Sequence, residues 1–283
     1  MIHMILGIDV GATSIKTGLF ATNGRLIALA NRRNAPEQDP SGQPGWMIWN
    51  PDTLWTNVCA CIQEVVAKSD GADQVRSVAC TGFGTDGLPM SKSGEPLYPF
   101  ISWHCGRTVP QREKMAGQVS DLEAFQITGY HNYHINTANR FLWFREHQPK
   151  VLDRAHRWLW VQDYIAHKLS GEFSTECTIA STAMLLDMGK RDWSPRMLAA
   201  SGVDPAILPP ISEAGTQIGA VTAKAASETG LKAGTPVVTG GHDCEVAVLG
   251  AGVSDADTWI DITGTWEILI ATVDRFAPTA EHH

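Results

Sequence analysis

Three predicted strands open the chain, and their order limits the folds that it can adopt. The segment MILGIDVGATSIKTGLFATNGRLIALANRR predicts strands over residues 5–10, 15–20 and 25–31, joined by the turns GATS and TNG. A helical pattern begins at Asp52, its expected N-cap, and ends at the SDG turn, after which the apolar run VRSVAC predicts a fourth strand. Antiparallel strands followed by a helix and a strand predict an α/β fold whose sheet later becomes parallel.

The central part of the chain is predicted to be mainly helical. Ser120 begins an S-x-x-E capping box, helices over residues 136–171 break near Pro149, and SPRMLAASG predicts a further short helix. Strand signals return at Pro236–Thr239, and the helix-like segment CEVAVLGAG comes soon after them. We therefore expect a helical insertion between two parts of one sheet.

A hairpin is predicted near the end of the sequence, over residues 259–263 and 267–272. Its pattern, IDITGTWEILIA, repeats that of IDVGATSIKTGLF at the beginning, and two such turns can hold a phosphate chain from both sides through backbone N–H groups. An isolated hairpin is only marginally stable. We therefore expect one whole domain over residues 1–250 and the beginning of a second, truncated domain over residues 251–283.

Composition and charge exclude several classes of function. The 283 residues are 43% hydrophobic and 18% charged, with a net charge of -8, so nucleic acid is not an expected partner. Apolar stretches end well before the ~18 residues that a membrane span needs, and no secretion signal precedes the first strand. The cysteines form no C-x-x-C pair, which favours free thiols in a reducing compartment. We expect a cytoplasmic protein that does not associate with membranes.

The segment TGFGTDG, residues 81–87, contains the spacing G-x-G-x-x-G after a predicted strand. In a dinucleotide-binding oxidoreductase this loop leads into a helix, whereas here LPMSKSGEPLYPFI follows, which predicts a hairpin. From the residues alone, the segment can be a glycine-rich turn in which Asp86 makes a local bond; the alternative, a contact of Asp86 with a bound ligand, depends on a family resemblance.

Several motifs together resemble one protein family. LGIDVGATSIKTGLF, GWMIWNP, FGTDG, LYPFISW, RDWSP and GGHD occur in an order similar to that in the FGGY carbohydrate kinases, members of the actin-like, ribonuclease H-like ATPase superfamily. The resemblance covers nearly the whole chain and is greatest for family members that act on L-fuculose. It implies a mixed sheet flanked by helices, with a sugar-binding domain over residues 1–250 and the beginning of a C-terminal ATP-binding domain over residues 251–283.

The resemblance implies a kinase that uses ATP and Mg²⁺ to phosphorylate a ketose similar to L-fuculose at a primary hydroxyl. Such a reaction needs a positioned base, a divalent cation and donors to the phosphate oxygens. Asp243 in GGHD is the expected base; alternatively it is the N-cap of the helix that starts at Cys244. Asp9 and Asp243 are the expected Mg²⁺ ligands. The expected ATP-binding residues are Asp9, Gly11, Thr13, Ser14, Lys16, Gly264 and Thr265.

The expected sugar contacts come from the other motifs. They are Asp86, Gly87, Trp103, Arg107, His242 and Asp243. Trp49 is a further candidate, because its ring can cover an apolar face of a sugar. Many family members have aspartate where this chain has Cys105, so contacts inferred from that position are not carried over.

The expected partners are a small sugar and ATP, with a homodimer as a candidate assembly. Two alternatives to an L-fuculose kinase follow from the resemblance: a kinase for another sugar, such as L-rhamnulose, xylulose, ribulose or a polyol, or a non-catalytic actin-fold binder of sugar or nucleotide. We expect the 283-residue chain alone to be inactive, because half of the nucleotide cleft is absent from it.

Overall fold

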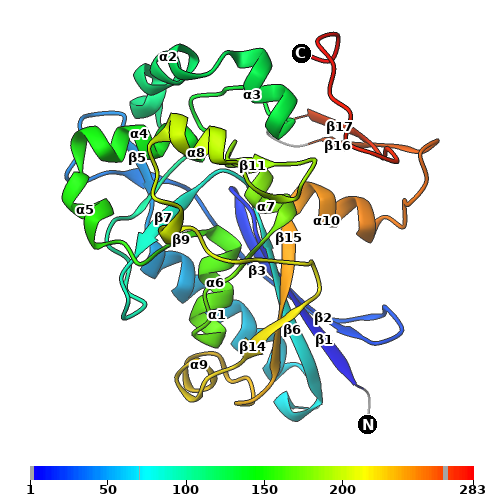
Figure 1. Cartoon of the computed structure of the whole chain (residues 1–283). Helices are drawn as coiled ribbons and strands as arrows, with labels where there is room; N and C mark the ends of the chain where they lie inside the picture. The colour runs from blue at the N-terminus through cyan, green and yellow to red at the C-terminus, as the bar shows by residue number, and fades with distance from the viewer. Residues whose placement is uncertain (1–2, 70, 264–266) are drawn as a thin grey trace.

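A mixed sheet of six strands forms the centre of the structure (Figure 1). The computed structural model describes residues 3–69, 71–263 and 267–283. Strands β1, β6 and β15 are parallel to one another, whereas β2 is antiparallel to both of its neighbours and β14 is antiparallel to β15. In sheet order the strands are β14 (Gln217–Ala220), β15 (Pro236–His242), β6 (Val75–Gly82), β1 (Met4–Val10), β2 (Ser14–Ala21) and β3 (Leu26–Arg33). The predicted change from antiparallel to parallel pairing is confirmed.

The sheet buries one face under helices α1 (Pro51–Ala67) and α6 (Val161–Ser170), and α9 (Ala223–Thr229) packs against both helices. Alternate residues of β1 are fully buried, since successive side chains of a strand point to opposite faces. Helix α1 begins two residues earlier than predicted. Its N-cap is Asn50, whose Oδ1 accepts hydrogen bonds from the N–H groups of Asp52 and Thr53, so the prediction of Asp52 as the N-cap is wrong.

A second hydrophobic core lies in the long insertion between β6 and β15, and it contains buried aromatic residues such as Trp143, Phe144 and Trp158. Its helices are α2 (Val109–Gln118), α3 (Asp121–Thr128), α4 (Thr137–His147), α5 (Pro149–Arg154), α7 (Cys177–Ser181) and α8 (Pro195–Ser201). Short strands pair at its edges. Strand β5 (Met47–Trp49) pairs with β4 (Glu37–Gln38) on one side and β8 (Phe100–Ile101) on the other, and the remaining pairs are β7 (Gly87–Met90) with β9 (Arg157–Trp160), β10 (Thr175–Glu176) with β13 (Ile211–Ser212), and β11 (Leu186–Asp187) with β12 (Asp192–Trp193).

Strand β9 corrects the sequence prediction, which assigned residues 157–160 to a helix. The sequence RWLW contains bulky aromatic residues that favour strands, and it pairs with β7 in an antiparallel ladder. The hairpin predicted after TGFGTDG is reduced to a short turn closed by a bridge between Met90 and Pro96. Tertiary pairing therefore decided the structure of both segments.

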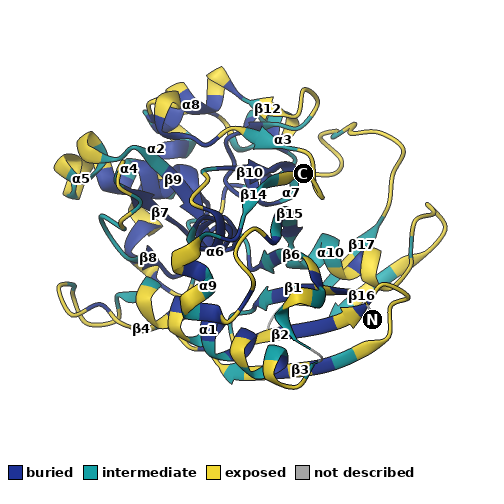
Figure 2. Ribbon diagram, turned by 90° about the horizontal axis from the view of Figure 1, so that it is seen from below, coloured by how far each residue is buried: buried dark blue, intermediate teal, exposed yellow. Residues whose placement is uncertain are grey.

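The carboxyl-terminal part of the chain differs from the rest in its burial. Helix α10 (Asp243–Gly250) contacts β15 and β6, whereas β16 (Trp259–Thr263) and β17 (Glu267–Ala271) form a separate two-stranded sheet. In Figure 2 this hairpin and the segments around it are mostly exposed, while buried residues follow the main sheet and the region around β7 and β9. Within the ranges that the structure describes, no helix is long and apolar enough to cross a membrane.

Candidate functional site

Three parallel strands end in register, and this alignment gathers the candidate catalytic residues. Asp9 of β1 is paired with Thr81 of β6, which is paired in turn with Gly241 of β15. The Thr81 hydroxyl donates a hydrogen bond of 2.7 Å to the Gly241 carbonyl oxygen. Ligands of open α/β sheets bind beyond the carboxyl ends of such strands. Asp9 and the GGHD motif therefore lie at the edge of the sheet where a small ligand is expected.

The turn between β1 and β2 is tight because Gly11 has no side chain. A Cβ atom at Gly11 would lie 2.9 Å from the Ser14 carbonyl oxygen. Asn34 holds the turn from outside: its side-chain amide donates to the Gly11 carbonyl at 2.9 Å, and its backbone N–H donates to the Thr13 carbonyl at 2.9 Å. Sequence reasoning missed Asn34. The turn presents the exposed Thr13 and the half-buried Ser14 at the end of the sheet.

Asp9 has a cation on one side and a second carboxylate within electrostatic reach. The ammonium of Lys16 lies 3.9 Å from Asp9 Oδ2, and both side chains are partly exposed. Burial raises the pKa of Asp9, Lys16 opposes this shift, and the charge of Asp243 adds to it. A second carboxylate that raises the free energy of the ionised form of Asp9 makes a divalent cation favourable at this position. The donor set at Asp9 and Asp243 thus fits the predicted Mg²⁺ site.

The GGHD motif brings β15 very close to β6. A Cβ atom at Gly240 would lie 1.9 Å from the Cys80 carbonyl oxygen, so no other residue fits there. His242 is the N-cap of α10 and Asp243 is its first residue. The interpretation of Asp243 as the N-cap is therefore wrong, because the helix begins one residue earlier than predicted.

His242 lies between two carboxylates. Its Nδ1 is 2.6 Å from Glu245 Oε2, and its Nε2 is 3.3 Å from Asp243 Oδ1. Burial lowers the pKa of His242, but the hydrogen bond with Glu245 and the charge of Asp243 outweigh burial, so the pKa lies above its ordinary value. The Asp243 side chain remains about one-third exposed, at 35%. It can therefore meet a substrate that approaches from solvent.

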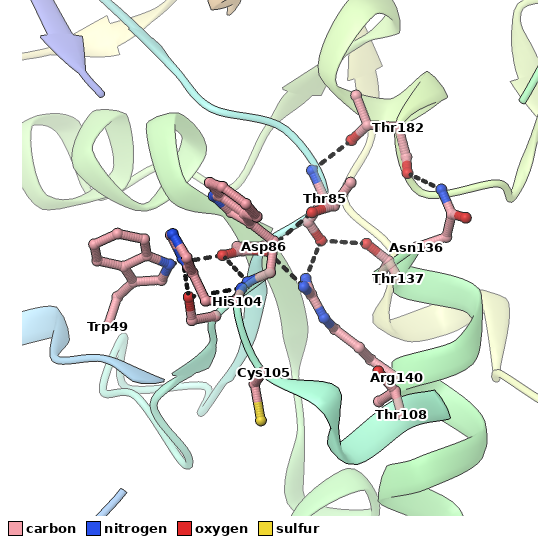
Figure 3. A network of polar contacts seen from close by, with 12 residues as sticks. Trp49, Thr85, Asp86, His104, Cys105, Thr108, Asn136, Thr137, Arg140 and Thr182 are labelled. Carbon is pink, nitrogen blue, oxygen red and sulfur yellow. Dashed lines mark hydrogen bonds and ion pairs between the residues drawn. The ribbon is translucent and has the colours of Figure 1, made fainter. Parts of the chain in front are cut away.

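Asp86 is fully buried, and four protein donors surround its carboxylate (Figure 3). Oδ2 accepts hydrogen bonds from Trp49 Nε1 at 2.7 Å and from the backbone N–H of Trp103 at 2.9 Å. Oδ1 accepts from the Thr85 hydroxyl at 2.9 Å and from Arg140 Nη2 at 2.5 Å. An ionised carboxylate offers about four lone-pair positions. All four are used, so in this structure Asp86 organises its neighbours and has no acceptor position left for a sugar.

The loop around Asp86 is held by residues that are distant in the sequence. Thr85 has a positive φ of 66°, and its carbonyl oxygen accepts hydrogen bonds from the Thr137 hydroxyl and from Arg140. The Thr85 N–H donates to the Thr182 hydroxyl at 2.8 Å. Sequence reasoning missed Arg140, which is 1% exposed and neutralises Asp86. The TGFGTDG segment is therefore a rigid loop anchored by an ion pair, and not a simple turn.

The glycines of this loop make room for protein side chains. A Cβ atom at Gly84 would lie 2.9 Å from His242 Nε2, and one at Gly87 would lie 2.1 Å from Trp158 Nε1. Trp158 thus occupies the space beside Gly87, where the sequence predicted a contact with the sugar. The loop continues into strand β7, and not into a helix, so the dinucleotide interpretation is wrong.

Two other predicted sugar contacts have different positions. Trp49 is 1% exposed, which rules out stacking on a ligand in this structure. The Arg107 side chain is fully buried, with Nη1 3.0 Å from Asp39 Oδ2, and its guanidinium lies over the ring of Trp46 at 4.4 Å. It therefore stabilises the second core. Trp103 is half-buried, and its ring stacks on His104 with the centroids 3.7 Å apart.

Two predicted ATP-binding residues, Gly264 and Thr265, lie outside the described residues. The other predicted ATP-binding residues, Asp9, Gly11, Thr13, Ser14 and Lys16, come from the end of β1, the β1–β2 turn and the start of β2. The predicted base and sugar contact, Asp243 and His242, come from the start of α10 and the end of β15 at the same end of the sheet.

Comparisons with known proteins agree on one family. Residues 4–250 match the family model described as "FGGY family of carbohydrate kinases, N-terminal domain". L-fuculokinase of Escherichia coli (strain K12) is 35% identical over 268 residues, which cover 95% of this chain and 56% of that protein. Autoinducer-2 kinase of Klebsiella pneumoniae is 30% identical, with 94% and 50% covered. The chain thus spans about half the length of these relatives.

Solved structures show the same fold at lower sequence identity. A ligand-bound xylulose kinase from Lactobacillus acidophilus has a TM-score of 0.90 at 20% identity, with 99% of this chain and 56% of that chain covered. A gluconate kinase from the same organism has a TM-score of 0.89 at 20% identity, with 97% and 55% covered. The predicted actin-like, ribonuclease H-like fold, as the first domain of such a kinase, is confirmed.

Proposed function

This chain belongs to the FGGY family of carbohydrate kinases, and from that premise we propose that it supplies the sugar-binding domain and the catalytic base of a ketose kinase. The observation that carries the proposal is the common position of Asp9 and Asp243 beyond the ends of parallel strands β1 and β15. Both carboxylates suit a metal ion, and Asp243 also suits the hydroxyl group of a substrate. A non-catalytic protein that only binds sugar or nucleotide does not need both carboxylates.

Asp243 is the proposed general base. In the reaction, the O–H bond of a primary hydroxyl breaks and its proton passes to the Asp243 carboxylate. The sugar oxygen bonds to the γ-phosphorus of ATP as the bond to the leaving ADP breaks. The partial exposure of Asp243 leaves it accessible to such a hydroxyl. Its backbone is fixed by the close contact between β15 and β6 at Gly240.

Asp9 and Asp243 are the proposed ligands of Mg²⁺, which would reduce the negative charge of the phosphates when bound. The β1–β2 turn lies at the same end of the sheet, and we propose that Thr13, Ser14 and Lys16 contact the phosphate groups of ATP. Lys16 adds a positive charge there, and its side chain is 51% exposed. Backbone donors of a tight turn supply the remaining contacts.

The sugar is proposed to lie between Trp103 and Asp243. Trp103 is half-buried, one face of its ring stacks on His104, and its backbone N–H donates to Asp86. Asp86 then acts on the sugar through Trp103, which replaces the direct contact expected from the sequence. L-Fuculose is the proposed ketose because L-fuculokinase of Escherichia coli is 35% identical to this chain.

The hairpin β16–β17 is the proposed start of a second, ATP-binding domain after residue 250. It does not pair with the main sheet, and Trp259 and Leu269 are 63% and 62% exposed. Apolar side chains on a two-stranded sheet need a further layer to cover them. We propose that this layer completes the nucleotide site.

Replacing Asp243 tests this function. Asp243→Asn in the natural gene product is expected to lower kcat for ATP-dependent phosphorylation of L-fuculose by about 10²–10⁴-fold. Sugar affinity, measured by calorimetry, is expected to change less than about tenfold, because the amide keeps the size and one acceptor oxygen. A variant with unchanged kcat would remove Asp243 from the role of base. Xylulose, ribulose and L-rhamnulose serve as comparison substrates, and a tenfold preference for any of them would replace L-fuculose as the assignment.

A further inference from the structure

The imidazole of His242 connects two carboxylates at the site. Its Nδ1 is 2.6 Å from Glu245 Oε2, its Nε2 is 3.3 Å from Asp243 Oδ1, and its side chain is only 13% exposed. We infer that Glu245 and His242 are positioning residues that orient the Asp243 carboxylate toward the sugar hydroxyl. This inference rests on the proposed role of Asp243 as the base. It assigns His242 a different task from the sugar contact expected from the sequence.

The backbone of His242 is fixed by a chain of hydrogen bonds from a buried acid. The N–H of His242 donates to the Thr178 hydroxyl oxygen at 2.8 Å. That hydroxyl donates in turn to Glu176 Oε1 at 2.6 Å, and Glu176 also accepts hydrogen bonds from the first N–H groups of α7. Glu176 is 2% exposed. The end of β15 is therefore attached to a rigid part of the insertion.

The ring of His242 also has little room to rotate. A Cβ atom at Gly84 would lie 2.9 Å from Nε2, so the loop that precedes Asp86 packs directly against the imidazole. On the opposite edge Nδ1 is held by Glu245, which lies one helical turn further along α10. With both ring edges occupied, the imidazole is held with Nε2 3.3 Å from Asp243 Oδ1.

This arrangement places the imidazole beside one oxygen of the base. Nε2 lies 3.3 Å from Oδ1 of Asp243, the Cys244 thiol also contacts this carboxylate, and we assign the proton of the hydroxyl to Oδ2. A base that rotates freely spends less time in the reactive geometry, and a displacement of about 1 Å can reduce the rate by on the order of 10²-fold. We therefore expect Glu245 to increase kcat by keeping the Asp243 carboxylate in its reactive orientation.

Glu245 is the residue to replace, because its side chain is 44% exposed and its loss leaves no buried cavity. In the natural gene product, Glu245→Ala is expected to lower kcat by on the order of tenfold to hundredfold, with KM for the ketose within about threefold. Glu245→Gln keeps an acceptor oxygen for the Nδ1–H group and is expected to restore most of kcat. Glu213→Ala removes a more exposed glutamate, which pairs with Arg191, and is the control with unchanged kinetics.

Two kinetic outcomes would overturn the inference: an unchanged kcat in Glu245→Ala, or a raised KM with the same kcat, which would make Glu245 a sugar contact. If Asp243 is not the base, the result is different: Asp243→Asn keeps its activity, whatever the effect of Glu245→Ala.

A second measurement does not depend on kinase activity. In the 283-residue chain, the ¹⁵N chemical shifts of the His242 ring nitrogens report their hydrogen bonds. Glu245→Ala is expected to shift the Nδ1 resonance strongly, and Asp243→Asn is expected to shift the Nε2 resonance. Ring shifts that stay the same in Glu245→Ala would show that the pair is absent in solution, and this result would refute the inference even for an inactive protein.

Discussion

Asp86 and Asp243 are two aspartates of glycine-rich motifs, but their environments differ in almost every respect. Asp86 is 0% exposed, and its four acceptor positions are all occupied by protein donors. The Asp243 side chain is 35% exposed, and its contacts within the described part of the chain are His242 Nε2, 3.3 Å from Oδ1, and the Cys244 thiol. A carboxylate that is saturated by its own protein stabilises the structure, whereas one with unoccupied acceptor positions can react. The number of unoccupied acceptor positions therefore separates the structural acid from the candidate base.

Removing each carboxylate in turn is the strongest test of this comparison. Asp86→Ala is expected to lower the free energy of unfolding by about 3–5 kcal/mol, because it leaves Arg140 buried without its partner. Asp243→Ala is expected to have little effect on stability, since the side chain is 35% exposed and its repulsion of Asp9 opposes its attraction to His242. Urea unfolding of the 283-residue chain, followed by tryptophan fluorescence, measures both.

A matched control comes from an exposed ion pair. Asp187→Ala removes the partner of Lys190, whose side chain is 74% exposed, and is expected to cost no more than about 1 kcal/mol. The comparison would break if Asp86→Ala were as mild as this control, because the donors around Asp86 would then contribute nothing to the fold.

A smaller effect is expected from the glycine next to Asp86. Gly87→Ala places a Cβ atom 2.1 Å from Trp158 Nε1, and the indole is fully buried and cannot move away freely. Overpacking of this kind costs about 1–3 kcal/mol. Gly117→Ala in α2 is the control, since nothing lies within 4 Å of its Cβ position, and alanine there is expected to stabilise the helix by up to about 1 kcal/mol. Equal melting temperatures for the two variants would contradict the packing that we describe beside Asp86.

The smallest effect concerns Asp9, which shares the open site with Asp243. Its pKa is raised in the folded state, mainly by burial. A carboxyl group with a raised pKa binds more protons when folded, so it reduces stability above its unfolded pKa of about 3.9, and this cost disappears as the pH falls below that value. Asp9→Asn is therefore expected to melt slightly higher than the unchanged chain at pH 7, and the difference is expected to shrink toward pH 4.

The effect of Mg²⁺ on the melting temperature is a further test of Asp9. Mg²⁺ that binds between Asp9 and Asp243 stabilises the folded chain and is expected to raise its melting temperature but not that of Asp9→Asn. An equal rise in both proteins would place the ion elsewhere. A lower melting temperature of Asp9→Asn at pH 7 without Mg²⁺ would show that the pairing with Lys16 outweighs burial.

The same contrast explains which parts of the molecule could be predicted from the sequence. The three opening strands and the helix after them follow from local apolar periodicity and turn residues, and the structure has all of them. The positions of Asp9 and Asp243 follow from the strands that precede them, because a residue after a parallel strand lies at a known edge of the sheet. The candidate base and metal ligands were therefore within reach of sequence reasoning.

The hydrogen-bond partners of Asp86 could not be predicted from the sequence. Arg140 lies 54 residues away in α4, where an arginine on a helix reads as a solvated side chain. Asn34 gives no local signal either, although it holds the β1–β2 turn. Strand β9 depends on pairing with β7, and about half of the insertion separates these two strands in the sequence. Burial and long-range pairing decide such features, and neither is encoded in local periodicity.

The contact between β6 and β15 also has a consequence for how the protein folds. Thr81 and Gly241 touch although 160 residues separate them, and the whole insertion lies between them. Closing so long a loop costs chain entropy before the contact forms, and such non-local pairings slow folding. Asp243 follows directly after this strand, so the open site is expected to take shape only when β15 has added to the sheet. Asp86 and Arg140 are closer in the sequence and can meet earlier. During synthesis the structural acid would then reach its native surroundings before the reactive one does.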